Sequence, residues 1–149
     1  MTNPTSSNTG FSALIALIAA LSSDPENFTL SEAQQGTVKD FFKGQRLTAG
    51  SSGWLAEAYV RDQDRLDGLI NYESILLQMN RSGQLREPLT LIYPREGVVT
   101  ADYPLLLLDA GKRAEYDKVI AWLRRPEIQE RLMRETDRRP ILPSVALEP

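Results

Sequence analysis

The stretch that decides the fold is Asn3-Pro4-Thr5-Ser6-Ser7-Asn8-Thr9-Gly10, which runs directly into the apolar segment Phe11–Leu21. A loop of small polar residues therefore enters a helix that we expect to be buried on several faces. The first turn of a helix has unpaired N–H groups and a partial positive charge. Hydroxyl and amide side chains there either cap the helix or bind a polar ligand. This predicts ligand contacts at Ser7, Asn8 and Thr9, with simple capping as the alternative.

The same loop-to-helix pattern recurs twice further along the chain. Gly50-Ser51-Ser52-Gly53 precedes Trp54, and Asn71-Tyr72 precedes Glu73-Ser74. Three such junctions in one small domain predict a shared binding edge, to which Ser51, Ser52, Tyr72 and Glu73 would contribute. Simpler interpretations stay open, because Ser51 and Ser52 can act as caps and Tyr72 can be a packing residue. An acid such as Glu73 is also stabilised at a helix start without any further role.

Composition narrows the function classes. The chain has 149 residues, enough for one domain or two small lobes, and its 42% apolar and 25% charged residues are typical of a globular protein. A net charge of −3 argues against broad nucleic-acid binding. Because there is no Cys and no His, disulfides, thiolate or imidazole metal sites and Ser-His-Asp catalysis are excluded. No cofactor is expected.

Weaker catalytic and metal motifs do not change this prediction. Asp62, Asp64 and Asp67 lack the glycine and the final glutamate of a calcium loop. A nucleophilic Ser51 or Ser52 would lack a histidine base and the Ser-x-x-Lys pattern. The apolar run 11–21 is shorter than the ~20 residues that a membrane span requires. We therefore expect a non-enzymatic domain without a metal site.

Hydrophobic periodicity predicts helices that alternate with strands. The helices are expected at residues 11–22, 31–43, 54–61, 73–80, 112–124 and 126–136, and the strands at Leu47–Ala49, Asp67–Tyr72, Leu89–Tyr93 and Val98–Leu108. Such alternation is typical of an α/β fold, here a three-layer α-β-α sheet. In such sheets, the polar loops that follow the strands gather at one edge, where ligands bind.

The ordered motifs also resemble a known family. Asn3-Pro4 with Gly10 before an Ala/Leu-rich helix, the Gly-Ser-Ser turn, Asn71-Tyr72-Glu73, Ile92-Tyr93-Pro94 and Ala101-Asp102-Tyr103-Pro104 are similar to bacterial extracellular solute-binding proteins of the periplasmic-binding class. The most similar subgroup is the molybdate/sulfate-like one, in proteins that also carry a von Willebrand factor type A domain. The resemblance spans roughly residues 3–140.

The resemblance implies one lobe of a two-lobed protein that holds its ligand in the cleft between lobes. Residues 1–109 would be the second lobe, and 110–149 a helical segment packed on this lobe or on a partner copy in a homodimer. The first lobe of the same protein would then be a missing partner. By position, Ser7, Asn8, Thr9, Ser51, Ser52 and Tyr72 would face the ligand. Glu73 departs from an oxyanion pattern, because a carboxylate repels anions, and favours a cationic, metal-bearing or polar organic ligand.

The resemblance also implies transport-related capture of a small polar solute in the periplasm or outside the cell. An export signal, or a segment that anchors the protein to a membrane, would lie outside this chain. The alternative from another class is a protein–protein interaction module that serves an attached von Willebrand factor A-like domain and needs no small ligand. A hydrolase is a minor third option. None of these interpretations predicts nucleic-acid binding.

Overall fold

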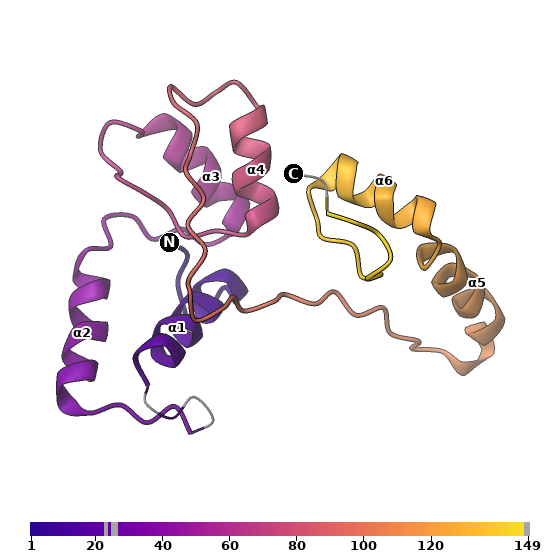
Figure 1. Ribbon diagram of the computed structural model, residues 1–149, viewed down its shortest axis with the longest axis horizontal. Helices are drawn as coiled ribbons and strands as arrows, with labels where there is room; N and C mark the ends of the chain where they lie inside the picture. Colours follow the sequence, from indigo (N-terminus) through magenta and orange to yellow (C-terminus); the bar gives the residue numbers. More distant parts are fainter. Residues whose placement is uncertain (23, 25–26, 148–149) are drawn as a thin grey trace. The chain divides into compact units, whose positions relative to one another are not determined.

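The computed structural model describes residues 1–22, 24 and 27–147. The chain forms two compact units, Met1–Thr100 and Ala101–Pro149 (Figure 1). The first contains α1 (Asn8–Leu21), α2 (Glu32–Lys43), α3 (Ser52–Arg61) and α4 (Glu73–Arg81). The second contains the short 3-10 helix η1 (Ala110–Lys112), α5 (Arg113–Leu123) and α6 (Pro126–Thr136). All six predicted α-helices are therefore confirmed, although α1 begins three residues earlier than expected.

Local signals explain where several helices begin. Ser31 and Gln34 form a capping box at the start of α2, in which each side chain binds the backbone of the other residue. The Ser51 hydroxyl caps α3 by accepting a hydrogen bond from Trp54 N at 3.2 Å. Pro126 occupies the first turn of α6, where its missing N–H costs nothing.

The predicted three-layer α/β sheet is wrong. The described residues form an all-α fold, and the only β contact among them is one parallel bridge between Thr2 and Ala49. In this bridge Asn3 N donates to Ala49 O at 3.2 Å, and Ala49 N donates to Met1 O at 3.3 Å. Leu47–Ala49 was the predicted strand that comes nearest to forming, because it alone finds a parallel neighbour.

Among residues 1–22, 24 and 27–147, the other predicted strands find no partner strand. β-Branched and apolar residues fit a pleated, half-buried surface, but a strand exists only when a neighbour completes its ladder. At Leu89 the side chain of Asn80 takes the place of a neighbouring strand. Leu89 N donates to Asn80 Oδ1 at 2.7 Å, and Asn80 Nδ2 donates to Leu89 O at 3.0 Å. Further along, Ile92 is 86% exposed and Leu108 is 93% exposed. The composition thus identified residues that favour strands, but these residues do not form strands in this structure.

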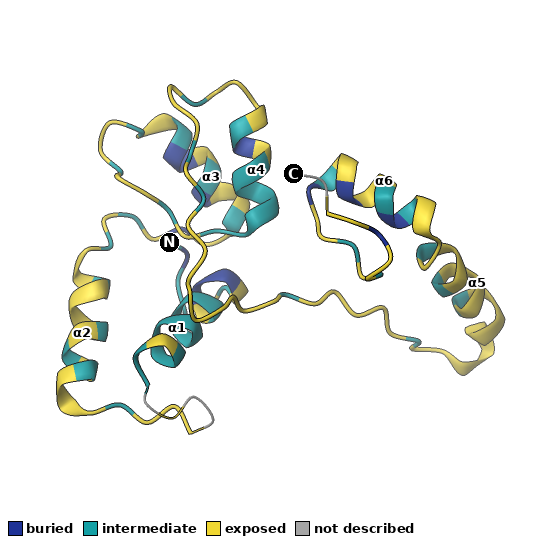
Figure 2. Cartoon of the chain, viewed as in Figure 1, coloured by how far each residue is buried: buried dark blue, intermediate teal, exposed yellow. Residues whose placement is uncertain are grey.

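The core of the first unit lies around α3 and the chain start. Its buried apolar side chains are Ala49, Leu55, Ala58, Tyr59 and Met79 (Figure 2). In α1 only Thr9 and Gly10 are buried, whereas its aliphatic side chains are half-buried, so the expectation of burial on several faces is wrong. The apolar run was long enough for a helix, but few elements pack around it.

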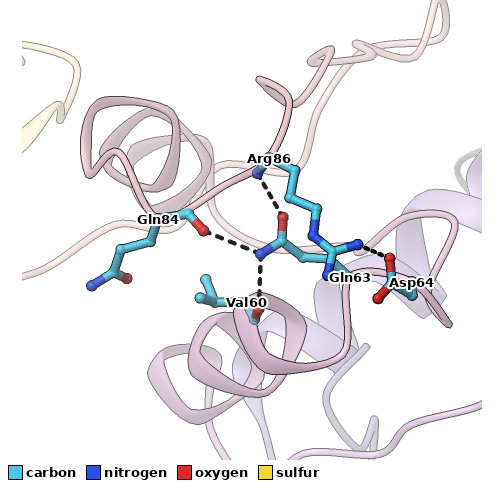
Figure 3. A network of polar contacts seen from close by, with 5 residues as sticks. All are labelled: Val60, Gln63, Asp64, Gln84 and Arg86. Atoms are coloured by element: carbon cyan, nitrogen blue, oxygen red, sulfur yellow. Dashed lines mark hydrogen bonds and ion pairs between the residues drawn. The ribbon is translucent and has the colours of Figure 1, made fainter.

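A side-chain amide connects the ends of α3 and α4 (Figure 3). Gln63 Nε2 donates to Val60 O at 2.8 Å and to Gln84 O at 3.1 Å, while Gln63 Oε1 accepts from Arg86 N at 2.9 Å. Arg86 also forms an ion pair with Asp64. The loop that follows α3 is therefore fixed to the loop that follows α4.

The second unit is organised by another amide. Gln129 on α6 is only 5% exposed; its Nε2 donates to Leu123 O at 2.6 Å, and its Oε1 accepts from Ile141 N at 2.9 Å. These bonds connect the end of α5, the middle of α6 and the C-terminal segment. The Arg138 guanidinium lies 4.5 Å from the centre of the Tyr103 ring, a cation–π contact. Residues 101–147 therefore make internal contacts of their own.

Gly10 allows α1 to lie close to the chain start, and its substitution tests this contact. A Cβ at this position would lie 2.6 Å from Thr2 O and 2.7 Å from Asn3 C, both backbone atoms that cannot move aside easily. Gly10→Ala is expected to lower the free energy of unfolding by about 1–3 kcal/mol. Gly36→Ala in α2 is the matched control, because a Cβ there meets nothing within 4 Å, and it should raise stability by about 0.5–1 kcal/mol. Urea denaturation measures both; equal stability of the two variants would contradict the packing described.

Candidate functional site

The starts of α1, α3 and α4 are joined by hydrogen bonds between residues far apart in the sequence. Asn8 Nδ2 donates to Tyr72 OH at 3.0 Å across a separation of 64 residues. Asn71 Nδ2 donates to Ser52 O at 2.9 Å across 19 residues. The structure thus brings the three loop-to-helix junctions together. We call this the helix-start edge, made of Ser7, Asn8, Ser51, Ser52, Tyr72, Glu73 and Tyr93.

At the α1 junction one of the three predicted residues is exposed, one is half-buried and one is buried. Ser7 is the N-cap residue of α1, but its side chain makes no capping hydrogen bond to the helix. Its position is set through the backbone, since Ser7 N donates to Asn3 O at 2.9 Å. Asn8 is exposed, whereas Thr9 is only 6% exposed. Ser7 and Asn8 can therefore meet a ligand, and Thr9 belongs to the packed base beneath them.

At the α3 junction the two serines have different roles. The Ser51 hydroxyl is engaged as the cap of the helix, so the simpler interpretation holds for this residue. Ser52 is the first residue of α3, and its carbonyl accepts the bond from Asn71. Its hydroxyl makes no hydrogen bond within the part of the chain that the structure describes. Ser52 is the better candidate for contact with a ligand.

The α4 junction carries the acidic group of the edge. Glu73 lies in the first turn of α4, where the helix dipole favours a carboxylate. Its Oε1 accepts a hydrogen bond from Tyr93 OH at 2.5 Å. Tyr93 was not among the predicted site residues, although it belongs to the Ile92-Tyr93-Pro94 motif. Only the path of the chain after α4 reveals its contact, which no local pattern signals.

The edge carries hydrogen-bonding groups together with one acidic group. Helix starts offer partial positive charge, the hydroxyls of Ser52 and Tyr72 offer donors and acceptors, and Glu73 offers a negative charge. Among the described residues, no three acidic side chains are grouped closely enough to hold a metal ion. The arrangement suits a ligand that carries both donor and acceptor groups.

A hollow that sequence reasoning did not identify lies at the other end of α3. Its lining includes Leu47, Leu55, Tyr59 and Leu69, and its volume is about 160 Å³. Leu55 lies in the middle of α3 and Tyr59 near its end, whereas Ser51 and Ser52 lie at its beginning. The helix-start edge is therefore a surface site that is separate from this hollow.

The bond between Asn8 and Tyr72 can be measured with a double-mutant cycle of Asn8→Ala and Tyr72→Phe. An exposed hydrogen bond contributes about 0.5–1.5 kcal/mol, and we expect a coupling energy in that range from urea denaturation of the four proteins. Pairing Asn8→Ala with Tyr116→Phe provides the control, because Tyr116 OH donates to Leu105 O in the second unit. A coupling energy near zero for Asn8 and Tyr72 would mean that these helix starts are not joined.

Comparison with known proteins gives no independent assignment. No family model, curated protein or solved structure matches the chain. None of the helices in the described ranges is both long and apolar enough to cross a membrane.

Proposed function

We propose that this chain captures a small polar ligand at the helix-start edge, as one lobe of an extracytoplasmic solute-binding protein, although the all-α fold of its described residues is not the α/β lobe that the resemblance implied. The observation that carries the proposal is the hydrogen bond between Asn8 and Tyr72, which holds two polar helix starts together across 64 residues. Asn71 extends the same cluster to Ser52. The three polar junctions therefore form one connected cluster of polar groups, which is the arrangement that a ligand site requires.

The charges of the edge favour a polar organic or cationic solute over a simple oxyanion. Helix starts alone would attract anions such as sulfate or molybdate. Glu73 opposes this with a carboxylate that the Tyr93 hydroxyl holds in place. Ser52 and Tyr72 add hydroxyls that can either donate or accept. A solute with both an acceptor and a donor or a cationic group fits this set.

The open position of the edge fits a site that is half of a cleft. Asn8 and Ser51 are exposed, so a ligand bound here would keep one face in water. A second lobe that closes over the ligand would supply the remaining contacts and exclude solvent. The isolated chain is then expected to bind weakly, because few groups offset the entropy lost on association.

The test is an NMR titration of the 149-residue chain with glycine betaine, glucose, L-serine and sulfate. At least one of the organic probes should shift the amide signals of residues 8–10, 52–54 and 73–75, and sulfate should not. Ser52→Ala should weaken that binding about two- to tenfold through loss of one hydrogen bond. Tyr116→Phe in the second unit is the matched control and should bind like the unaltered chain. Shifts with sulfate alone, or with no probe, would overturn the proposal.

A second candidate function is favoured by a different observation. Apolar side chains between 98 and 108 are exposed to an extent that usually marks a protein interaction surface; Leu106 is 69% exposed and Leu108 is 93% exposed. We infer a second copy of the chain as the occupant. The stretch 103–108 carries no charge, so two copies can lie antiparallel without facing like charges. This homodimer differs from the predicted one, which would form through the C-terminal helices, and from the predicted module that serves an attached von Willebrand factor A-like domain.

Self-association is tested by light scattering coupled to size-exclusion chromatography over a range of protein concentrations. The unaltered chain is expected to form a dimer, and the double variant Leu106→Lys/Leu108→Lys a monomer, because buried lysines oppose pairing. Leu147→Lys is the control, since Leu147 is also exposed, at 55%, but lies outside the apolar stretch. A monomeric unaltered chain at all concentrations would remove this candidate.

A further inference from the structure

The segment that follows α4 runs back along this helix and is fixed to it at two points. The Asn80 side chain binds both backbone groups of Leu89, at 2.7 and 3.0 Å, and Tyr93 OH donates to Glu73 Oε1 at 2.5 Å. From Glu73 to Asn80 the helix makes about two turns and rises about 10 Å, so both residues lie on one face of α4. The extended chain from Leu89 to Tyr93 spans a similar length, about 13 Å. Residues 89–93 therefore lie antiparallel to α4.

This path brings aromatic side chains to the Glu73 carboxylate. Tyr72 precedes Glu73 in the chain, and Tyr93 contacts it through its hydroxyl. The Tyr72 hydroxyl accepts a hydrogen bond from Asn8 Nδ2 at 3.0 Å, which brings the start of α1 to the same place. Phe11 lies three residues after Asn8 and so on the same side of α1. We call Phe11, Tyr72, Glu73 and Tyr93 the Glu73 subsite.

The Glu73 subsite is accessible to a ligand. Phe11 is 53% exposed and Tyr93 is 50% exposed, whereas Tyr72 and Glu73 are half-buried. All four residues belong to the unit Met1–Thr100. Single exposed apolar side chains are normal on protein surfaces. Here, however, the exposed rings come with a carboxylate that one of them holds by a hydrogen bond.

Aromatic rings beside a carboxylate attract organic cations. The face of an aromatic ring carries partial negative charge and binds ammonium groups, and rings of this kind recognise methylated ammonium groups in particular. Glu73 adds a full negative charge, which exceeds the roughly half charge of opposite sign at the start of α4. The Tyr93 hydroxyl is neutral and does not cancel this charge. The subsite therefore favours a cation, although it lies at a helix start.

The neighbouring part of the helix-start edge suits an oxygen atom of the same ligand. Asn71 Nδ2 donates to Ser52 O at 2.9 Å, which ties the start of α3 to the residue before Tyr72. The Ser52 hydroxyl and the N–H groups in the first turn of α3 are hydrogen-bond donors. A ligand with an ammonium group at one end and a hydroxyl or carbonyl oxygen at the other matches this order of groups.

We propose that the Glu73 subsite binds the methylated ammonium group of a small organic cation of the choline class. This inference rests on the proposed function, because it names the class of ligand that the helix-start edge selects. The positive charge meets the Glu73 carboxylate, and the methyl groups contact the rings of Tyr72 and Tyr93. Phe11 adds a third ring, and the oxygen end of the ligand lies toward Ser52.

The test is an NMR titration of the 149-residue chain with choline and two analogues that each lack one feature. 3,3-Dimethyl-1-butanol has the shape of choline without the charge, and ethanolamine has a charge without the methyl groups. Choline is expected to shift the amides of residues 73–75 and 92–93, and each analogue should bind at least about fivefold more weakly. If either analogue binds as tightly as choline, the proposal is wrong.

Variants separate the charge, the ring and the hydroxyl. Glu73→Gln should weaken choline binding about tenfold, and Tyr93→Leu about threefold or more. Tyr93→Phe keeps the ring and should bind within about twofold of the unaltered chain. A loss with Tyr93→Phe as large as with Tyr93→Leu would show that the hydroxyl only fixes the segment, and would overturn the ring contact.

Glu57→Gln is the matched control for the acid, because Glu57 is exposed on α3 and outside the subsite. It should leave choline binding unchanged, and an effect equal to that of Glu73→Gln would contradict the proposal. Melting temperatures of all variants show whether any loss of binding comes from unfolding instead.

The outcomes also separate this inference from the proposed function. Shifts of residues 52–54 and 73–75 with glucose or L-serine, and none with choline, would overturn the cation site and leave the proposed function standing. No shift with any of these probes would overturn both.

Discussion

The parallel bridge between Thr2 and Ala49 is the contact on which the arrangement of the first unit depends. Both residues are fully buried, and two backbone hydrogen bonds connect the chain start to the segment before α3. The bridge holds the entry to α1 beside the entry to α3. Gly10 makes this possible, because any side chain there would collide with the backbone of Thr2 and Asn3. The helix-start edge relies on this junction through α1.

Side-chain amides perform the connecting role that a sheet would otherwise have. Asn80 binds both backbone groups of Leu89, Gln63 joins the segments after α3 and α4, and Gln129 joins α5 to the C-terminal segment. An amide offers a donor and an acceptor in the spacing of a peptide group, so it can satisfy a backbone without a second strand. This explains how strand-forming residues such as Leu89 are held in an all-α structure.

The helices were predictable because their signals are local. A capping box at Ser31, a proline at Pro126 and apolar periodicity within one turn specify where a helix starts and which residues it contains. The strand predictions were wrong because a strand requires a hydrogen-bonded neighbour that can lie far away in the sequence. Val98–Leu108 has a strand-like composition, but its local sequence does not specify such a neighbour. The meeting of the helix starts was predictable from a repeated local pattern. The contact between Tyr93 and Glu73 was not, because it depends on the path of the chain after α4, which the Ile92-Tyr93-Pro94 motif does not signal.

The helix dipole gives the two ends of α3 different electrostatics. Ten residues span about 15 Å, so the ends are well separated. The start of α3 has a partial positive charge, which suits the acceptor groups of a ligand near Ser52. The partial negative charge at the other end is complemented by Arg61 in the last turn. At the helix-start edge, the acceptor groups of a ligand would therefore lie toward Ser52, and its donor or cationic groups toward the Glu73 carboxylate.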